Sequence, residues 1–124
     1  MPKILCVEDH PLQRTILVQM LELNDFEVAA ARDGAEAVEI ARSWDPDLIL
    51  MDLRLPKVDG FEAIKTIRTG EMTRCIPIIS ISAWAGSKDK DRALSLGAND
   101  HFVKPLDFTR LLRTIGEFLK QRSK

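Results

Sequence analysis

The chain of 124 residues has only two cysteines and no long apolar run. Cys6 and Cys75 are too few and too far apart for a zinc site, and we interpret both as small hydrophobic side chains buried in the core. A membrane-spanning helix needs about 20 successive apolar residues, far more than any run in this sequence. The short N-terminal apolar stretch runs directly into acidic residues, which is not typical of a secretory signal. We therefore expect a cytoplasmic protein that does not enter a membrane.

The sequence also lacks an excess of charge of either sign. It contains 18 basic and 19 acidic residues, which gives a formal net charge of -1. Such a balance provides no general attraction to nucleic acids or to anionic membranes. Basic residues do gather near the C-terminus of the last helical segment, a placement typical of a solvated helix end. We expect no direct contact with nucleic acid.

The composition and the length are those of one globular domain. Hydrophobic residues make up 45% of the chain and charged residues 30%. A chain of this length can bury roughly two-thirds of its unfolded surface, so it needs neither disulfides nor a structural metal to hold a core. Because the sequence has no linker, low-complexity segment or repeat, we expect residues 1–124 to form a single domain.

Short apolar runs alternate along the chain with segments of helical spacing. Continuous runs of this length are typical of parallel strands that are covered on both faces. The predicted strands are residues 3–7, 26–31, 47–51, 76–81 and 101–103. The first predicted helix starts at Pro11, the second covers 35–44, and the third covers 61–67 and ends at Gly70. The fourth lies between Ser87 and Gly97, and the fifth follows Asp107. This alternation predicts an α/β fold with helices on both faces of a parallel sheet, but it does not predict the strand order.

Three of the helix starts carry a capping signature. Asp33, followed three residues later by Glu36, resembles a capping box at the start of the second helix. Ser87 and Asp107 are the predicted caps of the fourth and fifth helices.

Polar side chains follow the apolar runs at the points where the predicted strands end. Glu8 and Asp9 follow the first run, Asp52 the third, Ser82 ends the fourth and Lys104 follows the fifth. One of these residues alone is readily explained as a helix cap or a surface charge. Together they lie at the same sheet edge, where crowded carboxylates need a cation and where Mg²⁺ prefers oxygen ligands. The set is what phosphoryl transfer needs, because that chemistry depends on positioning and charge neutralisation.

Longer motifs surround these five residues. They are Val7-Glu8-Asp9, Met51-Asp52-Leu53-Arg54-Leu55-Pro56 with Asp59-Gly60, Ile81-Ser82-Ala83, Gly97-Ala98-Asn99-Asp100 and Lys104-Pro105. With these motifs the chain resembles the receiver domain of two-component response regulators over essentially its full length. The resemblance implies a flavodoxin-like, doubly wound sheet of five parallel strands in the order 2-1-3-4-5 with five helices. That order makes the first and third strands neighbours.

The resemblance also implies roles for the residues at the sheet edge. Asp52 would accept a phosphoryl group from a sensor histidine kinase or a histidine phosphotransfer protein, so the chain would act on itself and not as an enzyme on other substrates. Lys104 would bind a phosphoryl oxygen, Ser82 would turn towards the phosphate, and the small side chain of Ala83 would leave room for it. Pro105 would follow a cis peptide bond.

A metal site is implied by the same resemblance. Asp9, Asp52 and the backbone carbonyl of Arg54 would ligate Mg²⁺, or Mn²⁺ in its place, and Glu8 would act through water. Phosphorylation would then shift the surface formed by the fourth helix, the fifth strand and the fifth helix. That surface would control binding of an unknown downstream protein, and a homodimer through it remains open.

Three further positions bear on the switch and on the lifetime of the phosphate, and one of them departs from the family pattern. His101 stands where the family usually has Tyr or Phe. Our hypothesis is that His101 shares the switch role with Ser82 and makes the output mildly pH-sensitive near its reference pKa of about 6.5. The alternative is that His101 faces solvent at the sheet edge. The resemblance implies that Arg54 and Trp84 flank the path of water to the phosphate. Trp84 would then either shield the phosphate, dock a partner or fill a groove.

Two other functions compete with the receiver assignment. A magnesium-dependent phosphohydrolase would use Asp52 as the nucleophile on an external substrate, but it commonly needs a second acid where this chain has Arg54. An interaction module that is never phosphorylated would not need the complete set of polar residues at the sheet edge.

Overall fold

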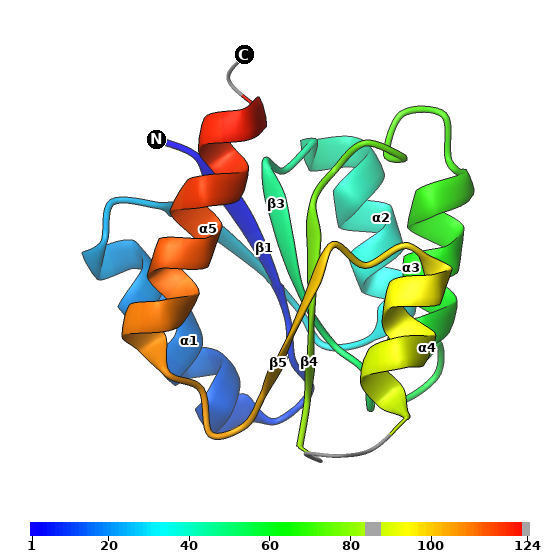
Figure 1. The fold of residues 1–124 in the computed structure, drawn as a ribbon, viewed down its shortest axis with the longest axis horizontal. Coiled ribbons are helices and arrows are strands. Elements are labelled where there is room, and N and C mark those ends of the chain that lie inside the picture. Colours follow the sequence, from blue (N-terminus) through cyan, green and yellow to red (C-terminus); the bar gives the residue numbers. More distant parts are fainter. Residues whose placement is uncertain (84–87, 123–124) are drawn as a thin grey trace.

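In the computed structural model, which describes residues 1–83 and 88–122, five strands alternate with five helices (Figure 1). The strands are β1 (Lys3–Val7), β2 (Glu27–Ala31), β3 (Leu48–Asp52), β4 (Ile78–Ser82) and β5 (Asp100–Val103). The helices are α1 (Pro11–Leu23), α2 (Gly34–Trp44), α3 (Gly60–Thr69), α4 (Asp89–Leu96) and α5 (Phe108–Arg122). The predicted α/β alternation is therefore confirmed, and each strand begins and ends within two residues of its predicted bounds.

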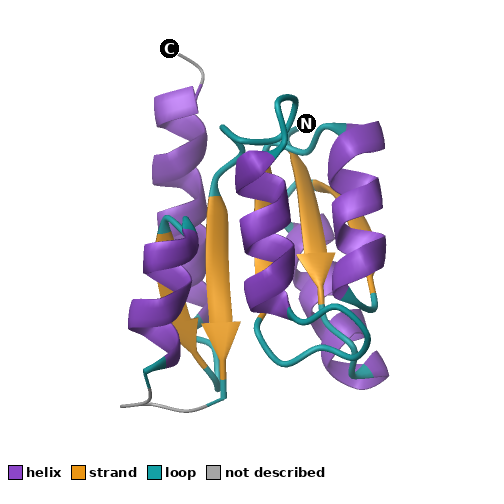
Figure 2. Ribbon diagram, turned by 90° about the vertical axis from the view of Figure 1, so that its right-hand side faces the viewer, coloured by secondary structure: helices purple, strands orange, loops and turns teal. Residues whose placement is uncertain are grey.

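The strands form one parallel sheet in the order β2-β1-β3-β4-β5, as the resemblance implied. Val7 of β1 pairs with Met51 of β3, so the residues that follow them, Glu8 and Asp52, lie next to each other. All the strand arrows point the same way, and the loops that follow them meet at one end of the sheet (Figure 2). The sheet order thus creates the crowding of carboxylates that the sequence predicted.

Helices cover both faces of the sheet. Helices α1 and α5 lie on one face, while α2, α3 and α4 lie on the other (Figure 1). Side chains alternate along each strand, so Ile4 and Cys6 of β1 pack in the core under α1 and α5. Leu5 and Val7 pack in the opposite core. Every residue of β3 and of β4 is buried, which explains their continuous apolar runs.

Capping side chains define several helix ends. Asp33 caps α2, because its Oδ1 accepts a hydrogen bond from the N–H of Glu36 at 2.9 Å. In a capping box, Glu36 would in return accept a hydrogen bond from the N–H of Asp33. Glu36 instead accepts from the N–H of Arg32, so this part of the predicted capping box is wrong. Asp107 caps α5 through the N–H of Arg110 at 3.1 Å, as predicted. Helix α4 begins after Lys88, and Ser87, its predicted cap, lies outside the described residues.

The two cysteines have different environments. Cys6 is fully buried in β1, as predicted. The prediction is wrong for Cys75, which is exposed because it lies in a surface turn between α3 and β4. None of the helices in the described part of the chain has the length and apolar character needed to cross a membrane.

Candidate functional site

Three carboxylates meet at the carboxyl end of the sheet. Glu8 follows β1 directly, Asp9 is the next residue, and Asp52 ends β3. One oxygen atom of each lies within 4.8 Å of the others. Glu8 and Asp52 are each only 5% exposed, whereas Asp9 is exposed to water. Oxygen ligands beside an open, hydrated position suit Mg²⁺, which keeps several of its waters when it binds to proteins.

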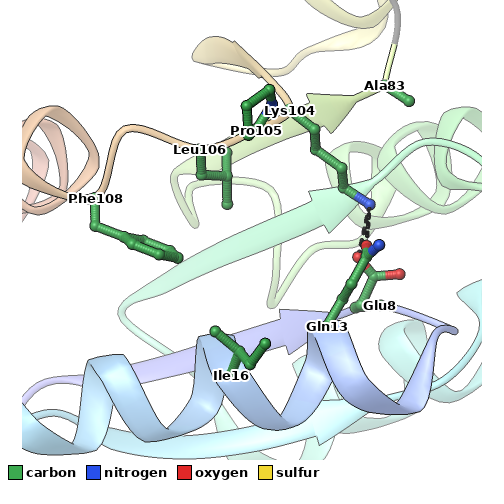
Figure 3. A pocket seen from close by; sticks show the side chains of 8 residues that line it. All are labelled: Glu8, Gln13, Ile16, Ala83, Lys104, Pro105, Leu106 and Phe108. Carbon is green, nitrogen blue, oxygen red and sulfur yellow. Dashed lines mark hydrogen bonds and ion pairs between the residues drawn. The ribbon is translucent and has the colours of Figure 1, made fainter.

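Lys104 reaches across the sheet end to these acids. Its Nζ donates hydrogen bonds to Oε1 of Glu8 at 2.8 Å and to Oδ2 of Asp52 at 2.9 Å. It also donates to Oε1 of Gln13 at 2.9 Å. Figure 3 shows the side chains of Lys104, Gln13 and Glu8 converging. The structure therefore brings together four of the predicted site residues: Glu8, Asp9, Asp52 and Lys104.

Burial, hydrogen bonds and neighbouring charges shift the pKa values of two of these groups. Burial raises the pKa of Glu8, and the negative charge of Asp52 raises it further, although hydrogen bonds from Lys104 and His10 oppose the change. Burial alone would lower the pKa of Lys104, but its hydrogen bonds to Glu8 and Asp52 raise that pKa overall. Lys104 is therefore held in its charged form between the two carboxylates.

Gln13 was not among the predicted site residues. It lies in the first turn of α1, four residues after Asp9, and its amide oxygen contacts Lys104. The spacing from Asp9 gives no signal, because Asp9 precedes the N-cap His10 and lies outside the helix. An uncharged side chain at that spacing does not identify a site without the position of Lys104.

Arg54 lies at the rim of the site, in the loop after β3. Its backbone N–H donates to Oδ1 of Asp52 at 3.0 Å, so both oxygens of Asp52 accept a hydrogen bond. Its guanidinium forms a two-bond contact with the carboxylate of Asp89, the first residue of α4, at 2.9 and 3.1 Å. That Arg54 flanks the path of water to the phosphate stays a prediction. Trp84, the other predicted residue of that path, lies outside the described residues.

Ser82 and His101 contact each other between β4 and β5. Oγ of Ser82 lies 3.0 Å from Nε2 of His101, and Oγ of Ser80 lies 2.6 Å from Nδ1 of the same ring. Because His101 is only 7% exposed, the alternative that it faces solvent is wrong. Burial also lowers the pKa of His101. Protonation of His101 would therefore affect the output at a lower pH than we predicted. Ser80 was not predicted, although its spacing of two residues from Ser82 places both on one strand face.

An open cavity of about 480 Å³ adjoins Glu8 and Lys104 (Figure 3). Ala83 lies at its edge and is exposed. The peptide bond between Lys104 and Pro105 is cis, as expected. The other side chains that line the cavity are Glu8, Gln13, Ile16, Leu106 and Phe108. The cavity therefore has a charged end at the sheet and an apolar end between α1 and the start of α5.

The chain resembles known proteins over nearly its whole length. The family model of the response regulator receiver domain matches residues 4–116. The polar-differentiation response regulator DivK of Brucella anthropi is 36% identical over 96% of this chain and 98% of its own length. A receiver domain of a Pseudomonas aeruginosa sensor histidine kinase is 37% identical, with a TM-score of 0.90, and it holds a magnesium ion in its active-site cleft. The match covers 96% of this chain and 98% of that one. The chemotaxis protein CheY4 of Vibrio cholerae is 30% identical, with a TM-score of 0.88, over 95% of this chain and 98% of its own.

Proposed function

Because this chain belongs to the family of response regulator receiver domains, we propose that Asp52 accepts a phosphoryl group in a magnesium-dependent reaction. The observation that carries this proposal is the orientation of the Asp52 carboxylate. Its Oδ1 accepts from the N–H of Arg54 and its Oδ2 accepts from Lys104, so the side chain is held in one position at the open end of the sheet. A fixed nucleophile beside a cation is what phosphoryl transfer requires.

The transfer uses an oxygen of Asp52 as the nucleophile. This oxygen attacks the phosphorus atom of a phosphohistidine, the new O–P bond forms as the P–N bond breaks, and the electron pair of that bond remains on the donor imidazole. Lys104 neutralises a phosphoryl oxygen, and Ser82 donates a hydrogen bond to another. Ala83 leaves room for the group.

Four residues would hold the metal ion. They are Glu8, through water, Asp9, Asp52 and the backbone carbonyl of Arg54. Bound Mg²⁺ supplies positive charge that offsets the repulsion between the acids and the incoming phosphoryl group. The magnesium ion in the related Pseudomonas receiver domain and the acidic cluster of this chain support the choice of metal. Binding of Mn²⁺ stays a prediction.

A phosphohydrolase is not favoured. The relatives that match this chain are receiver domains and response regulators, and Arg54 stands where a hydrolase of this kind commonly has its second acid. That arginine is engaged with Asp89 and has no group that could protonate a leaving alcohol. We therefore assign to Asp52 only its own phosphorylation and dephosphorylation.

Arg54 and Trp84 are our candidates for tuning the lifetime of the phosphate. The hydrogen bond from the backbone N–H of Arg54 to Oδ1 of Asp52, which places Arg54 beside the phosphoacceptor, supports its part in this proposal. Substitution Trp84→Ala tests the other part, since loss of a shielding side chain would speed the dephosphorylation of Asp52. An unchanged rate would leave Trp84 as a docking or groove-filling residue.

Receiver domains generally interact with histidine kinases or phosphotransfer proteins and with downstream targets. For this chain we assign the phosphoryl donor to a sensor histidine kinase or a histidine phosphotransfer protein. The surface of α4, β5 and α5 is the proposed output face for a downstream protein or a second copy of the chain. Helix α5 extends beyond residue 116, where the family model ends, which supports a single receiver unit over residues 1–124. The cytoplasmic location and the absence of nucleic-acid contact stay predictions.

Incubation with acetyl phosphate and Mg²⁺ tests the proposed function. We expect intact-mass analysis to detect a single phosphoryl group that is labile to base and is absent from the Asp52→Asn variant. Asp25→Asn is the matched control, because Asp25 is an exposed carboxylate with a left-handed backbone that Asn tolerates. Labelling of Asp52→Asn, or steady turnover of a small phosphoester, would overturn the proposal.

A further inference from the structure

Arg54 contacts both the candidate phosphoacceptor and the start of α4. Its backbone N–H donates to Oδ1 of Asp52 at 3.0 Å. Its guanidinium donates to both carboxylate oxygens of Asp89, the first residue of α4, at 2.9 and 3.1 Å. Because Asp52 ends β3 and Asp89 begins α4, Arg54 is a direct link between the end of the sheet and a helix of the proposed output face.

The guanidinium of Arg54 holds Asp89 through one of its three nitrogens. Both hydrogen bonds start from Nη2, whereas the strongest contact of an arginine with a carboxylate uses two parallel N–H groups. The arginine side chain is 62% exposed, and its Cζ lies 5.6 Å from the centre of the Phe61 ring. The contact with Asp89 therefore uses only part of the donor capacity of the guanidinium.

Asp89 has a second source of stabilisation. It lies in the first turn of α4, and the N-terminus of a helix carries a partial positive charge that favours a carboxylate. Its side chain is only 10% exposed, so its charge needs compensation inside the protein. If the guanidinium moved to another anion, the end of the helix would still stabilise Asp89, which lowers the cost of that exchange.

The side chain of Arg54 starts close enough to Asp52 to reach a group attached there. The backbone nitrogen of Arg54 lies 3.0 Å from Oδ1 of Asp52, and the N–Cα bond adds about 1.5 Å, so Cα lies within about 4.5 Å of that oxygen. The guanidinium is on a long, flexible stem beyond this Cα. A phosphoryl group on Asp52 would add negative charge and three acceptor oxygens within its range.

We propose that Asp89 is a positioning residue that holds the guanidinium of Arg54 at α4, and that a phosphoryl group on Asp52 takes this guanidinium from Asp89. The proposal rests on the proposed function and deepens it, because it assigns a link between Asp52 and the start of α4. The equilibrium shifts because the guanidinium has a more highly charged acceptor only after phosphorylation. By reciprocity, any change that weakens the contact with Asp89 strengthens phosphoryl binding.

Binding of beryllofluoride, a phosphoryl mimic, tests this competition. Its dissociation constant is measured by ¹⁹F spectra of the full chain at saturating Mg²⁺. Asp89→Asn removes the competing charge and should tighten binding by about three- to tenfold. Arg54→Met should weaken binding, and the double variant should bind like Arg54→Met. Loss of any other contact of Asp89 affects both Arg54 backgrounds equally, so the cycle isolates the part that acts through the guanidinium.

Two further variants are controls. Asp91→Asn removes the same charge from an exposed position in the same turn of α4, and it should change the dissociation constant by less than about twofold. Asp89→Glu keeps the charge and should bind more like the unsubstituted protein than Asp89→Asn does. A merely structural role of Asp89 would not tighten binding of the mimic.

Three outcomes would overturn the proposal. If Asp89→Asn does not tighten binding, if it tightens binding equally in the Arg54→Met background, or if Asp91→Asn has the same effect, Asp89 does not compete for the guanidinium. The proposed function stands in each case, provided that acetyl phosphate labels Asp52. If beryllofluoride does not bind and acetyl phosphate does not label Asp52, the proposed function is wrong and the role of Asp89 falls with it.

Discussion

Lys104 provides Asp52 with an internal counter-ion, since its Nζ lies 2.9 Å from Oδ2 of Asp52 and 2.8 Å from Oε1 of Glu8. The two carboxylates come from neighbouring strands and are almost fully buried, so their repulsion is weakly screened by solvent. The ammonium group and a bound Mg²⁺ ion would therefore serve the same electrostatic purpose at this end of the sheet.

Substitution Lys104→Met should lower the free energy of unfolding by about 1–3 kcal/mol in the absence of Mg²⁺, because it leaves two buried carboxylates without their cation. Saturating Mg²⁺ should restore more stability to this variant than it adds to the unsubstituted protein. Urea unfolding with and without Mg²⁺ measures both effects. Lys65→Met, at an exposed lysine of α3, is the control. Equal responses of the two variants to Mg²⁺ would contradict this prediction.

The contact between Arg54 and Asp89 should contribute measurably to stability. Asp89 is 10% exposed at its side chain and accepts two hydrogen bonds from Arg54, whose own side chain is 62% exposed. A double-mutant cycle with Arg54→Met and Asp89→Asn should give a coupling energy of about 1 kcal/mol in urea unfolding.

A pair on the helix surface is the matched control for this cycle. Arg32 and Glu36 are separated by 3.8 Å with side chains 71% and 34% exposed, and their coupling energy should be below about 0.5 kcal/mol. Coupling energies of the same size in both cycles would mean that the link between the loop after β3 and α4 has no special role in stability.

The lowered pKa of His101 should make the protein less stable in mild acid. Burial disfavours the charged ring in the folded state, and Lys90 opposes protonation as well, while Asp89 and Asp100 favour it. The unfolded chain then takes up the proton first as the pH falls below about 6.5, so the free energy of unfolding decreases between that pH and the pKa of the folded protein. The contribution of His101 to the free energy of unfolding is fully retained above that pH range.

Urea unfolding at about pH 7.5 and about pH 5.5 measures this contribution of His101. In His101→Phe the change in unfolding free energy between the two conditions should be smaller than in the unsubstituted protein. The difference between the proteins is the informative quantity, because other groups titrate equally in both. An identical pH dependence would show that His101 is not responsible.

Two glycines should respond to alanine substitution in opposite directions. A Cβ atom at Gly60 would overlap the backbone oxygen of Asp52 and lie 2.6 Å from Cα of Leu53, so the start of α3 would have to move away from the end of β3. Gly60→Ala should therefore destabilise the protein by about 1–3 kcal/mol and weaken Mg²⁺ binding.

The matched substitution is Gly116→Ala in α5. A Cβ atom there meets nothing within 4 Å, and alanine is the better helix former, so the gain should be about 0.5–1 kcal/mol without a change in Mg²⁺ binding. Thermal unfolding and a magnesium titration of both variants give the comparison. A similar loss from both would argue against steric overlap at Asp52.

The parts of the fold that depend on neighbouring residues could be predicted from the amino-acid sequence. Strand β3 was recognisable because it begins with four successive buried apolar residues. The cap of α2 was recognisable because Asp33 bonds to a backbone N–H only three residues away. The same reasoning located Asp52 and Lys104, since each follows an apolar run directly. Periodicity did not predict the strand order, which came from the family resemblance and which the sheet confirms.

Contacts between distant elements were different. Lys104 bonds to Gln13 across 91 positions of the chain, Arg54 to Asp89 across 35 and Ser80 to His101 across 21. None of these pairs has a local pattern, because the distance between two side chains on different elements depends on how the helices and strands pack. Local composition and spacing thus determined which elements form and which residues end them, whereas packing of the sheet and helices determined which of those residues meet.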